Sequence, residues 1–311
     1  MSDPAPDSSD TAGLPPIPPG PVVALFKTLR PHQWVKNVFV AAPLVFSQHL
    51  GNTDSIARTA IAVLAFCLLS GAVYCFNDVL DVEADRAHPK KKYRPIASGA
   101  LSERTALITA VVLAVIALGF SFALSWKLAV VAAIYGTQNV VYSIKLKHVA
   151  FLDVGLIAFG FILRVLAGAY AIGVPASWWL IACTALLATF LGLGKRAHEL
   201  AWAHRTGSRA ATRAALAGYS IRGVKIAMYV LAVATCASYV MYTLDPHTRE
   251  MFKSDRLVFS APWVAVGLVR FILIALRPRD ESPTEAMLKD PWFLSILGCA
   301  VGTILFAIYG R

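Results

Sequence analysis

Long apolar runs dominate this sequence and limit what the chain can fold into. Several runs of about 20 residues carry few or no charges, so each is long enough to cross the roughly 30 Å hydrocarbon core of a bilayer. Lipid offers the backbone no hydrogen-bond partners, and such segments must therefore be helical. Only 15% of the residues are charged and the mean hydropathy is +0.62, values typical of a membrane protein.

The runs predict an all-α, polytopic membrane bundle of nine transmembrane helices. We expect the spans at residues 37–50, 58–76, 106–124, 127–144, 151–173, 177–194, 223–243, 257–276 and 291–309. Pro31 and Pro43 interrupt the first span, which a membrane helix packed against its neighbours tolerates. We expect an amphipathic helix at the membrane interface near Val22, before this span.

The rest of the sequence shows no motif of a secreted protein, a cysteine- or histidine-ligated metalloprotein or a common soluble enzyme class. Residues 1–21 are rich in proline and lack the basic and apolar segments of a signal peptide, so we expect a disordered N-terminal tail. Residues 22–311 then form one transmembrane domain. The five cysteines and seven histidines show no metal-ligand spacing, and no motif of a serine hydrolase, P-loop ATPase or CxxC redox protein occurs.

Basic residues are distributed unevenly between the two sides that nine spans would create. One side, which includes the N-terminal region and the 77–105 loop, carries 21 of the 29 lysines and arginines, whereas the other carries 6. By the positive-inside rule, this asymmetry predicts a cytoplasmic N-terminus in the inner (plasma) membrane. The net charge of +11 thus describes one membrane face, where anionic headgroups and an anionic substrate are expected and nucleic acid is not.

The most informative segment follows the second span and reads N-D-V-L-D-V-E-A-D-R over residues 77–86. If the helix continues through it, Asp78, Asp81 and Asp85 are spaced i, i+3 and i+7 and share one face. Asn77 lies one turn before Asp81. Like charges so placed repel each other unless a cation binds, and Mg²⁺ takes oxygen ligands from carboxylates and substrate phosphates. We therefore predict that the three aspartates bind Mg²⁺ and are the catalytic residues.

Four basic residues follow these carboxylates: Lys90, Lys91, Lys92 and Arg94. They suit phosphate oxygens that a metal leaves uncovered, because arginine forms two parallel hydrogen bonds to phosphate and lysine acts as a point charge. The alternative is a solvated loop whose acids and bases only pair with each other, but salt bridging gives no reason for the helical spacing of the carboxylates. We expect the four cations to bind substrate, together with Asn77.

A second cluster, G-L-G-K-R-A-H-E over residues 192–199, lies at the cytoplasmic end of the sixth span. Lys195 and Glu199 are spaced i, i+4 on one helix face, with Arg196 beside them. We interpret the cluster as a phosphate clamp with a carboxylate that supports it or reaches a metal. Simple anchoring of the helix by cations at the membrane surface is the alternative.

Arg164 is the most diagnostic single residue, because it lies in the middle of the fifth span. An arginine within the membrane is costly and normally faces a paired or water-filled interior. At 100° per residue it falls within about 20° of the helix face that carries Asp153. We expect Arg164 to face a substrate cavity, since the end of the span is too far away for its guanidinium to reach easily.

Three more candidates for substrate binding flank the spans. Lys36 belongs to R-P-H-Q-W-V-K-N (30–37) at the entrance of the first span, where basic and tryptophan residues often serve only as membrane anchors. Tyr142 and Lys147 lie at and beyond the end of the fourth span. Polar residues one turn inside the membrane usually face the bundle interior, which predicts a cavity wall there.

The N-D-x-x-D-x-x-x-D motif at the end of the second span resembles the first aspartate motif of the UbiA superfamily of intramembrane prenyltransferases. The stretches 30–37, 81–99 and 194–200 are more narrowly similar to the decaprenyl-phosphate phosphoribosyltransferase branch. The resemblance covers nearly the whole chain from Leu29 onward. It implies a UbiA-like catalytic domain over residues 22–311 and a site that faces the cytoplasm.

The resemblance also implies a reaction. The donor would be phosphoribosyl pyrophosphate, the acceptor a polyprenyl phosphate, and the cofactor Mg²⁺, in the synthesis of lipid-linked sugars for the cell wall. Typical UbiA prenyltransferases carry a second aspartate-rich motif near the end of the sixth span, where this chain has Lys195 and Arg196. Cations in place of carboxylates fit a reaction with two phosphorylated substrates and put a second metal in doubt.

Two other functions remain open at this point. One is prenyl transfer from a prenyl diphosphate to an aromatic or other acceptor, which would use the same first motif. The other is transport of anions or metals, which would need an internal repeat or charges spread through the spans. Neither feature is evident, because Arg164 carries most of the charge within the membrane.

Overall fold

The computed structural model describes residues 20–144, 146, 149–206, 216, 218–277 and 282–310. The expected N-terminal tail falls almost wholly outside these residues, as does Lys147. Every regular element within them is helical. In chain order these are α1 (Pro21–Leu29), the 3₁₀ helix η2 (Pro31–Ala41), α2 (Ala42–Phe46), α3 (Thr53–Leu80), α4 (Val82–Arg86), η3 (Lys91–Tyr93), α5 (Glu103–Leu124), α6 (Trp126–Ile144), α7 (Leu152–Ile172), α8 (Trp178–Thr206), α9 (Ile221–Leu244), α10 (Pro246–Phe252), η7 (Arg256–Ser260), α11 (Ala261–Ala275), α12 (Pro283–Lys289) and α13 (Pro291–Tyr309).

The all-α prediction is confirmed for the part of the chain that the structure describes. Within it, 7 helical segments are long and apolar enough to cross a membrane. They are Thr53–Leu80, Glu103–Leu124, Leu152–Ile172, Trp178–His204, Ile221–Leu244, Arg256–Ala275 and Pro291–Tyr309. The other two predicted spans are also helical: α6 covers the fourth, and η2 with α2 covers most of the first.

Pro31, before the first predicted span, and Pro43, within it, each lie at the start of a helix. Pro31 begins the 3₁₀ helix η2, and Pro43 lies in the first turn of α2, where a missing amide proton costs no helical hydrogen bond. The predicted helix near Val22 is α1, whose Val22 and Phe26 are exposed. Such an apolar exposed face suits a helix that lies on a membrane.

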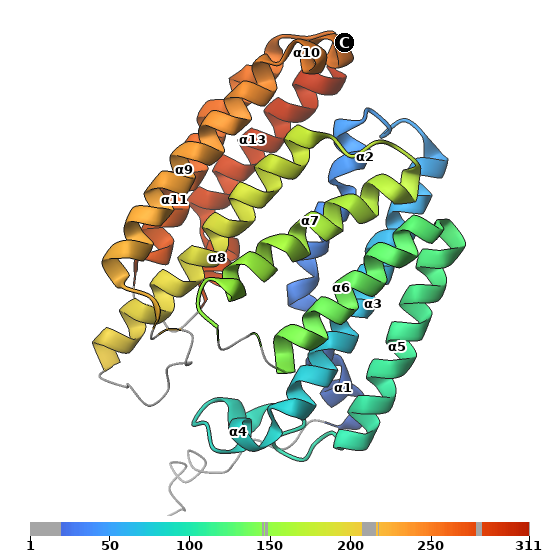
Figure 1. Cartoon of the computed structure of the whole chain (residues 1–311), viewed down its shortest axis with the longest axis vertical. Coiled ribbons are helices and arrows are strands. Elements are labelled where there is room, and N and C mark those ends of the chain that lie inside the picture. The colour runs from blue at the N-terminus through green and yellow to red at the C-terminus, as the bar shows by residue number, and fades with distance from the viewer. Residues whose placement is uncertain are drawn as a thin grey trace, which may run out of the picture.

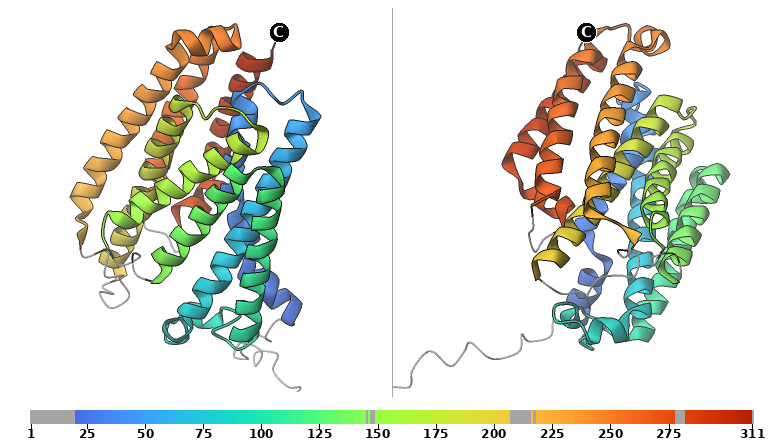
Figure 2. Two further views of the ribbon diagram at one scale, coloured as in Figure 1. Left: turned by 45° about the vertical axis from the view of Figure 1, so that its right-hand side comes forward. Right: turned by 60° about the vertical axis from the view of Figure 1, so that its left-hand side comes forward.

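The helices run between two ends of the molecule (Figure 1). The short helices α1 and α4 lie at one end, whereas α10 and the C-terminus lie at the other. Both views of Figure 2 keep this arrangement, with α5 at one side of the bundle and the α9, α11 and α13 group at the opposite side. Helices α7 and α8 lie next to each other, between α5 on one side and the α9, α11 and α13 group on the other.

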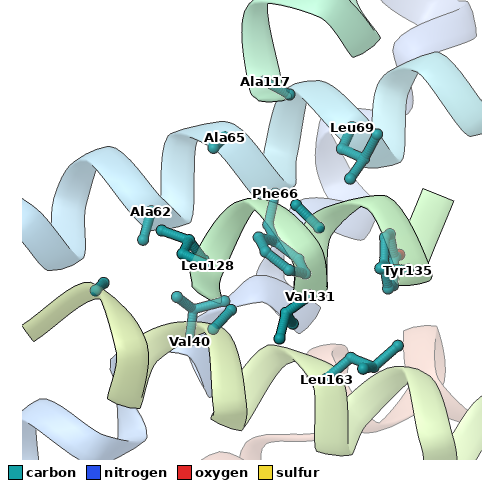
Figure 3. Close-up of a cluster of buried hydrophobic side chains, with 13 residues drawn as sticks. Val40, Ala62, Ala65, Phe66, Leu69, Ala117, Leu128, Val131, Tyr135 and Leu163 are labelled. Atoms are coloured by element: carbon teal, nitrogen blue, oxygen red, sulfur yellow. The ribbon is translucent and has the colours of Figure 1, made fainter. Parts of the chain in front are cut away.

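The N-terminal half is packed around the side chain of Phe66 on α3 (Figure 3). Phe66 is fully buried and contacts a cluster to which η2, α6 and α7 contribute Val40, Leu128 and Leu163. A second cluster joins α8, α9 and α11, where the rings of Phe190 and Phe271 lie 5.2 Å apart. Helix α7 contributes to both clusters and so connects the two halves.

Glycine on α7 allows one close helix approach. The sequence predicts that Gly155, Gly160 and Gly168 let neighbouring helices come near. The prediction is confirmed for Gly168, where an added Cβ would lie 1.9 Å from the carbonyl oxygen of Val40 on η2. It is wrong for Gly155, which has no atom within 4 Å of such a Cβ. At Gly160 the nearest atom, Nη1 of Arg164, is at ordinary contact distance, 3.6 Å.

We expect Gly168→Ala to destabilise the protein, because the backbone of η2 would have to move away from α7. Overpacking of this kind costs about 1–3 kcal/mol. Gly155→Ala on the same helix is the matched control and should be neutral or stabilising, since alanine is the better helix former. Thermal unfolding in detergent measures both variants, and equal unfolding temperatures would contradict the close contact.

Candidate active site

The carboxylates lie where α3 ends. At about 1.5 Å per residue its 28 residues extend roughly 42 Å, more than a bilayer core requires, so its last turns project beyond the hydrocarbon. One part of the sequence prediction is wrong: the helix does not continue unbroken through Asp85. Asp81 has φ −95° and ψ 6°, which ends α3, and α4 begins at the next residue. Aspartate competes with helical hydrogen bonds and so favours such positions.

Arg94 nevertheless brings two of the three carboxylates together. Its Nη1 donates to Oδ1 of Asp78 at 3.2 Å and to Oδ2 of Asp85 at 2.6 Å. Arg30 donates to the same Asp78 oxygen at 2.5 Å. Asp78 and Asp85 are only 4% and 2% exposed, so their charges need these partners. Asp81 lies partly exposed at the helix break between them.

The oxygen atoms here suit a hard cation that is shared with a substrate. Among the described residues, no group of three or more histidine, cysteine, aspartate or glutamate side chains is arranged to hold a metal. Mg²⁺, however, is commonly held by one or two carboxylates together with phosphate oxygens and water. The side-chain oxygen of Asn77, next to Asp78, is buried and accepts no hydrogen bond from the described residues. Asp78, Asp85 and Asn77 therefore offer a donor set that fits Mg²⁺.

The basic stretch surrounds these carboxylates only in part. The Lys91 ammonium lies 3.9 Å from Asp85, and that of Lys90 lies 5.9 Å from the ring centre of Trp202 on α8. Lys92 lies over the ring of Tyr93 and is exposed. Lys90, Lys91 and Arg94 thus place three positive charges near the end of α3, with Lys90 on the side of α8.

His88 shapes the turn that holds these lysines. Its Nδ1 accepts hydrogen bonds from the backbone amides of Lys90 and Lys91 at 3.2 and 3.3 Å. Desolvation and the positive charge of Lys91 lower the pKa of His88. The lower pKa favours the neutral imidazole, and only the neutral ring has a nitrogen that accepts.

Arg164 is buried, and its guanidinium contacts neutral oxygens and the rings of Tyr135 and Phe161. It donates from Nε to Oδ1 of Asn37 at 2.9 Å, from Nη1 to the Gly160 carbonyl at 3.0 Å and from Nη2 to Oη of Tyr135 at 2.7 Å. Asn37 belongs to η2 and Tyr135 to α6, so one arginine joins three helices. No carboxylate of the described residues lies within ion-pair distance of it, so its positive charge is not neutralised by the protein.

Lys36 precedes Asn37, which accepts a hydrogen bond from Arg164. Burial lowers the pKa of Lys36 to about 7, and the positive charges of Lys195 and Arg164 add to the effect. In a 3₁₀ helix, residues three apart share a face. Gln33 therefore lies beside Lys36, and it donates to Glu285 of α12 at 3.4 Å. The structure thus brings η2, α7, α8 and α12 together around one half-buried lysine.

Arg196 lies in a different environment from the phosphate clamp that the sequence predicts. It is fully buried, with Nε 2.9 Å from Oδ2 of Asp153 on α7, and it is also paired with Glu199. Asp153 in turn accepts a hydrogen bond from Tyr219 at 2.8 Å. Burial and this hydrogen bond raise the pKa of Tyr219. Arg196 and Asp153 therefore hold α7, α8 and the segment before α9 together, and the Arg196 side chain has no exposed surface, whereas that of Glu199 is 26% exposed.

Sequence reasoning missed several of the residues that complete these networks. Arg30 lies in the 30–37 stretch, but nothing in its spacing indicates a partner in α3. Asp153 is the single acidic residue of its span, which is the signal that could have suggested a buried pair. The partners of Arg30 and Asp153 become recognisable only when the helices are packed.

Tyr142, which the sequence predicts to line a cavity wall, lies half-buried near the end of α6.

Comparison with known proteins places the chain in a family. The family model described as "UbiA prenyltransferase family" matches residues 38–305. The chain belongs to the UbiA prenyltransferase family. It is 35% identical to a protein of Mycolicibacterium smegmatis named decaprenyl-phosphate phosphoribosyltransferase, over 97% of both chains. A protein of the same name from Corynebacterium glutamicum is 34% identical, over 92% of this chain and 86% of that one.

A solved structure of a UbiA family member has the same fold. The UbiA homologue from Archaeoglobus fulgidus bound to GPP and Mg²⁺ superposes with a TM-score of 0.69. The alignment covers 92% of this chain and 99% of that chain at 17% sequence identity. The arrangement of helices is therefore that of the UbiA fold.

We expect Arg196→Met to destabilise the fold, because Asp153 would keep a buried charge without its partner. Loss of one member of a buried ion pair costs about 3–5 kcal/mol. Lys195→Met should leave the unfolding temperature nearly unchanged, since Lys195 is only half-buried. Thermal unfolding of the two purified variants tests this difference. Equal stability would show that Arg196 is not a structural residue.

Proposed function

We propose that this protein transfers the phosphoribosyl group of phosphoribosyl pyrophosphate to a polyprenyl phosphate and releases pyrophosphate. The observation that carries the proposal is the 35% identity, over 97% of both chains, to a decaprenyl-phosphate phosphoribosyltransferase. The site supports it, because cations outnumber carboxylates around the end of α3. Two phosphorylated substrates need more positive charge than the diphosphate of a single one.

The donor would bind at Asp78 and Asp85. Mg²⁺ held by these carboxylates, with Asn77 nearby, would supply a Lewis acid for the charge that develops on the leaving pyrophosphate. Arg30 and Arg94 now donate to the carboxylates. When a cation replaces them, both guanidinium groups are free to donate to pyrophosphate oxygens, where arginine binds through two hydrogen bonds.

The reaction then exchanges two bonds at the anomeric carbon. The bond from this carbon to the pyrophosphate oxygen breaks, the carbon becomes oxocarbenium-like, and an oxygen of the lipid phosphate forms the new bond. That oxygen is already anionic, so the attack requires no general base. Lys90, Lys91 and Arg94 would hold the pyrophosphate in position, a contribution of orientation rather than of proton transfer.

The assay that tests this function offers purified protein both donors. With Mg²⁺ and a polyprenyl phosphate, radiolabelled phosphoribosyl pyrophosphate should yield a labelled lipid whose mass is that of polyprenyl-phosphoryl phosphoribose. Consumption of a prenyl diphosphate with an aromatic acceptor, and not of the sugar donor, would show that the protein is a prenyltransferase instead.

We expect Asp78→Asn and Asp85→Asn each to lower phosphoribosyl transfer by about 100-fold or more, the scale on which charge stabilisation at a reacting centre contributes. Asparagine retains an oxygen for the arginines, so the fold should survive. Glu83→Gln on α4 is the matched control, because Glu83 is exposed and pairs with Arg86. Wild-type turnover of either aspartate variant at limiting Mg²⁺ would exclude its carboxylate from the metal site.

We further propose that the protein crosses the plasma membrane nine times and that its site faces the cytoplasm. The distribution of basic residues supports this orientation. An odd number of spans is supported by the position of α1 and the C-terminus at opposite ends of the molecule (Figure 1).

A membrane-impermeant maleimide should label Ser102→Cys, at the exposed start of α5, only after the cells are opened. The parent protein, whose Cys299 is exposed, sets the background. Labelling of Ser102→Cys in intact cells beyond this background would reverse the orientation.

A further inference from the structure

The charges at this end of the bundle form two groups that differ in composition. At the end of α3, Arg30 and Arg94 are paired with Asp78. Around η2, by contrast, Lys36 and Arg164 have no carboxylate within ion-pair distance among the described residues. Among the described residues, Glu285 is the acidic group whose charge raises the pKa of Lys36. The second group therefore carries excess positive charge.

This excess charge is partly buried, which favours an anion as its partner. Arg164 is 7% exposed and has used Nε, Nη1 and Nη2 on protein oxygens, so it contributes its charge and the position of Asn37 rather than a direct contact. Lys36 is half-buried on the face of η2 that Gln33 shares. Its ammonium has three donors, none of which is satisfied by a described residue through a hydrogen bond.

We propose that Lys36 and Lys195, supported by Arg164, bind the phosphate monoester of the lipid acceptor, separately from the pyrophosphate at Asp78 and Asp85. This inference rests on the proposed function and adds the position of its second substrate. Lys36 lies on η2, one residue before the first predicted span, and Lys195 lies on α8. A lipid phosphate held between two membrane helices can leave its hydrocarbon tail in the bilayer.

An anionic partner also explains the presence of a lysine at a site where burial and neighbouring positive charges disfavour its charged form. The groups that act on Lys36 are Arg30 before η2, Arg164 on α7, Lys195 on α8 and Glu285 on α12. Three of these are positive and, with burial, lower the pKa of Lys36 to about 7. A phosphate dianion between Lys36 and Lys195 favours the charged lysine, so its binding should weaken as pH rises above about 7.

Steady-state kinetics with farnesyl phosphate as acceptor test the assignment. Lys36→Met should raise KM for the acceptor by about 10-fold or more, the scale expected for loss of a charged hydrogen bond. It should change KM for phosphoribosyl pyrophosphate by less than about 2-fold, because only the acceptor contacts Lys36. Lys225→Met, an exposed lysine at the start of α9, is the matched control and should change neither constant. A rise confined to the donor KM, or no rise at all, would overturn the proposal.

Lys36→Arg separates a charge effect from a packing effect. The acceptor KM of the wild type should rise between about pH 7 and pH 8.5. The acceptor KM of Lys36→Arg should not change over this pH range, because arginine remains charged. The same pH dependence in both proteins would contradict the role of Lys36.

Calorimetric titration of the protein with farnesyl phosphate measures acceptor binding in the absence of turnover. If the wild type transfers no phosphoribosyl group, the proposed function fails, but weaker binding to Lys36→Met than to the wild type would still support the anion site. Equal binding by both proteins would remove it.

Discussion

A carboxylate near the end of a membrane helix needs a cation, and Asp78 obtains one from two directions. Arg30 reaches it from the start of η2, and Arg94 reaches it from the loop beyond α4. Arg94 also binds Asp85, so the loop is folded back onto the helix end. A buried carboxylate without a partner costs too much free energy to persist. The acidic motif can therefore lie beside the membrane only because these arginines pair with it.

The same constraint assigns different tasks to the two buried arginines. Arg196 is neutralised by Asp153 and Glu199, and the result is a cross-link between α7 and α8. Arg164 on α7 is solvated by Asn37, Gly160 and Tyr135 and keeps its charge. A neutralised arginine can fix helices, whereas an arginine with only neutral acceptors can also attract an anion. Helix α7 thus carries both Asp153, which pairs with Arg196, and Arg164, for which we propose a role in substrate recognition.

Periodicity and hydropathy predicted the positions of the helices well, because a membrane permits few alternatives. The effect of the prolines near the first span and the position of the acidic motif after the second span could also be predicted from the local sequence. The break at Asp81 was not, because a single backbone change does not alter the spacing of the motif. Nor was the burial of Arg196, since its partner Asp153 lies in the preceding helix and only packing brings the two together.

We propose that Asp78 and Asp85 exchange their arginine partners for a metal ion that pyrophosphate also binds. Electron paramagnetic resonance with Mn²⁺ in place of Mg²⁺ tests this exchange most directly. In the wild type, we expect pyrophosphate to induce a protein-bound Mn²⁺ signal with phosphorus coupling. The Asp78→Asn and Asp85→Asn variants should lose this signal. The same bound signal in all three proteins would contradict the exchange and show that the metal binds elsewhere.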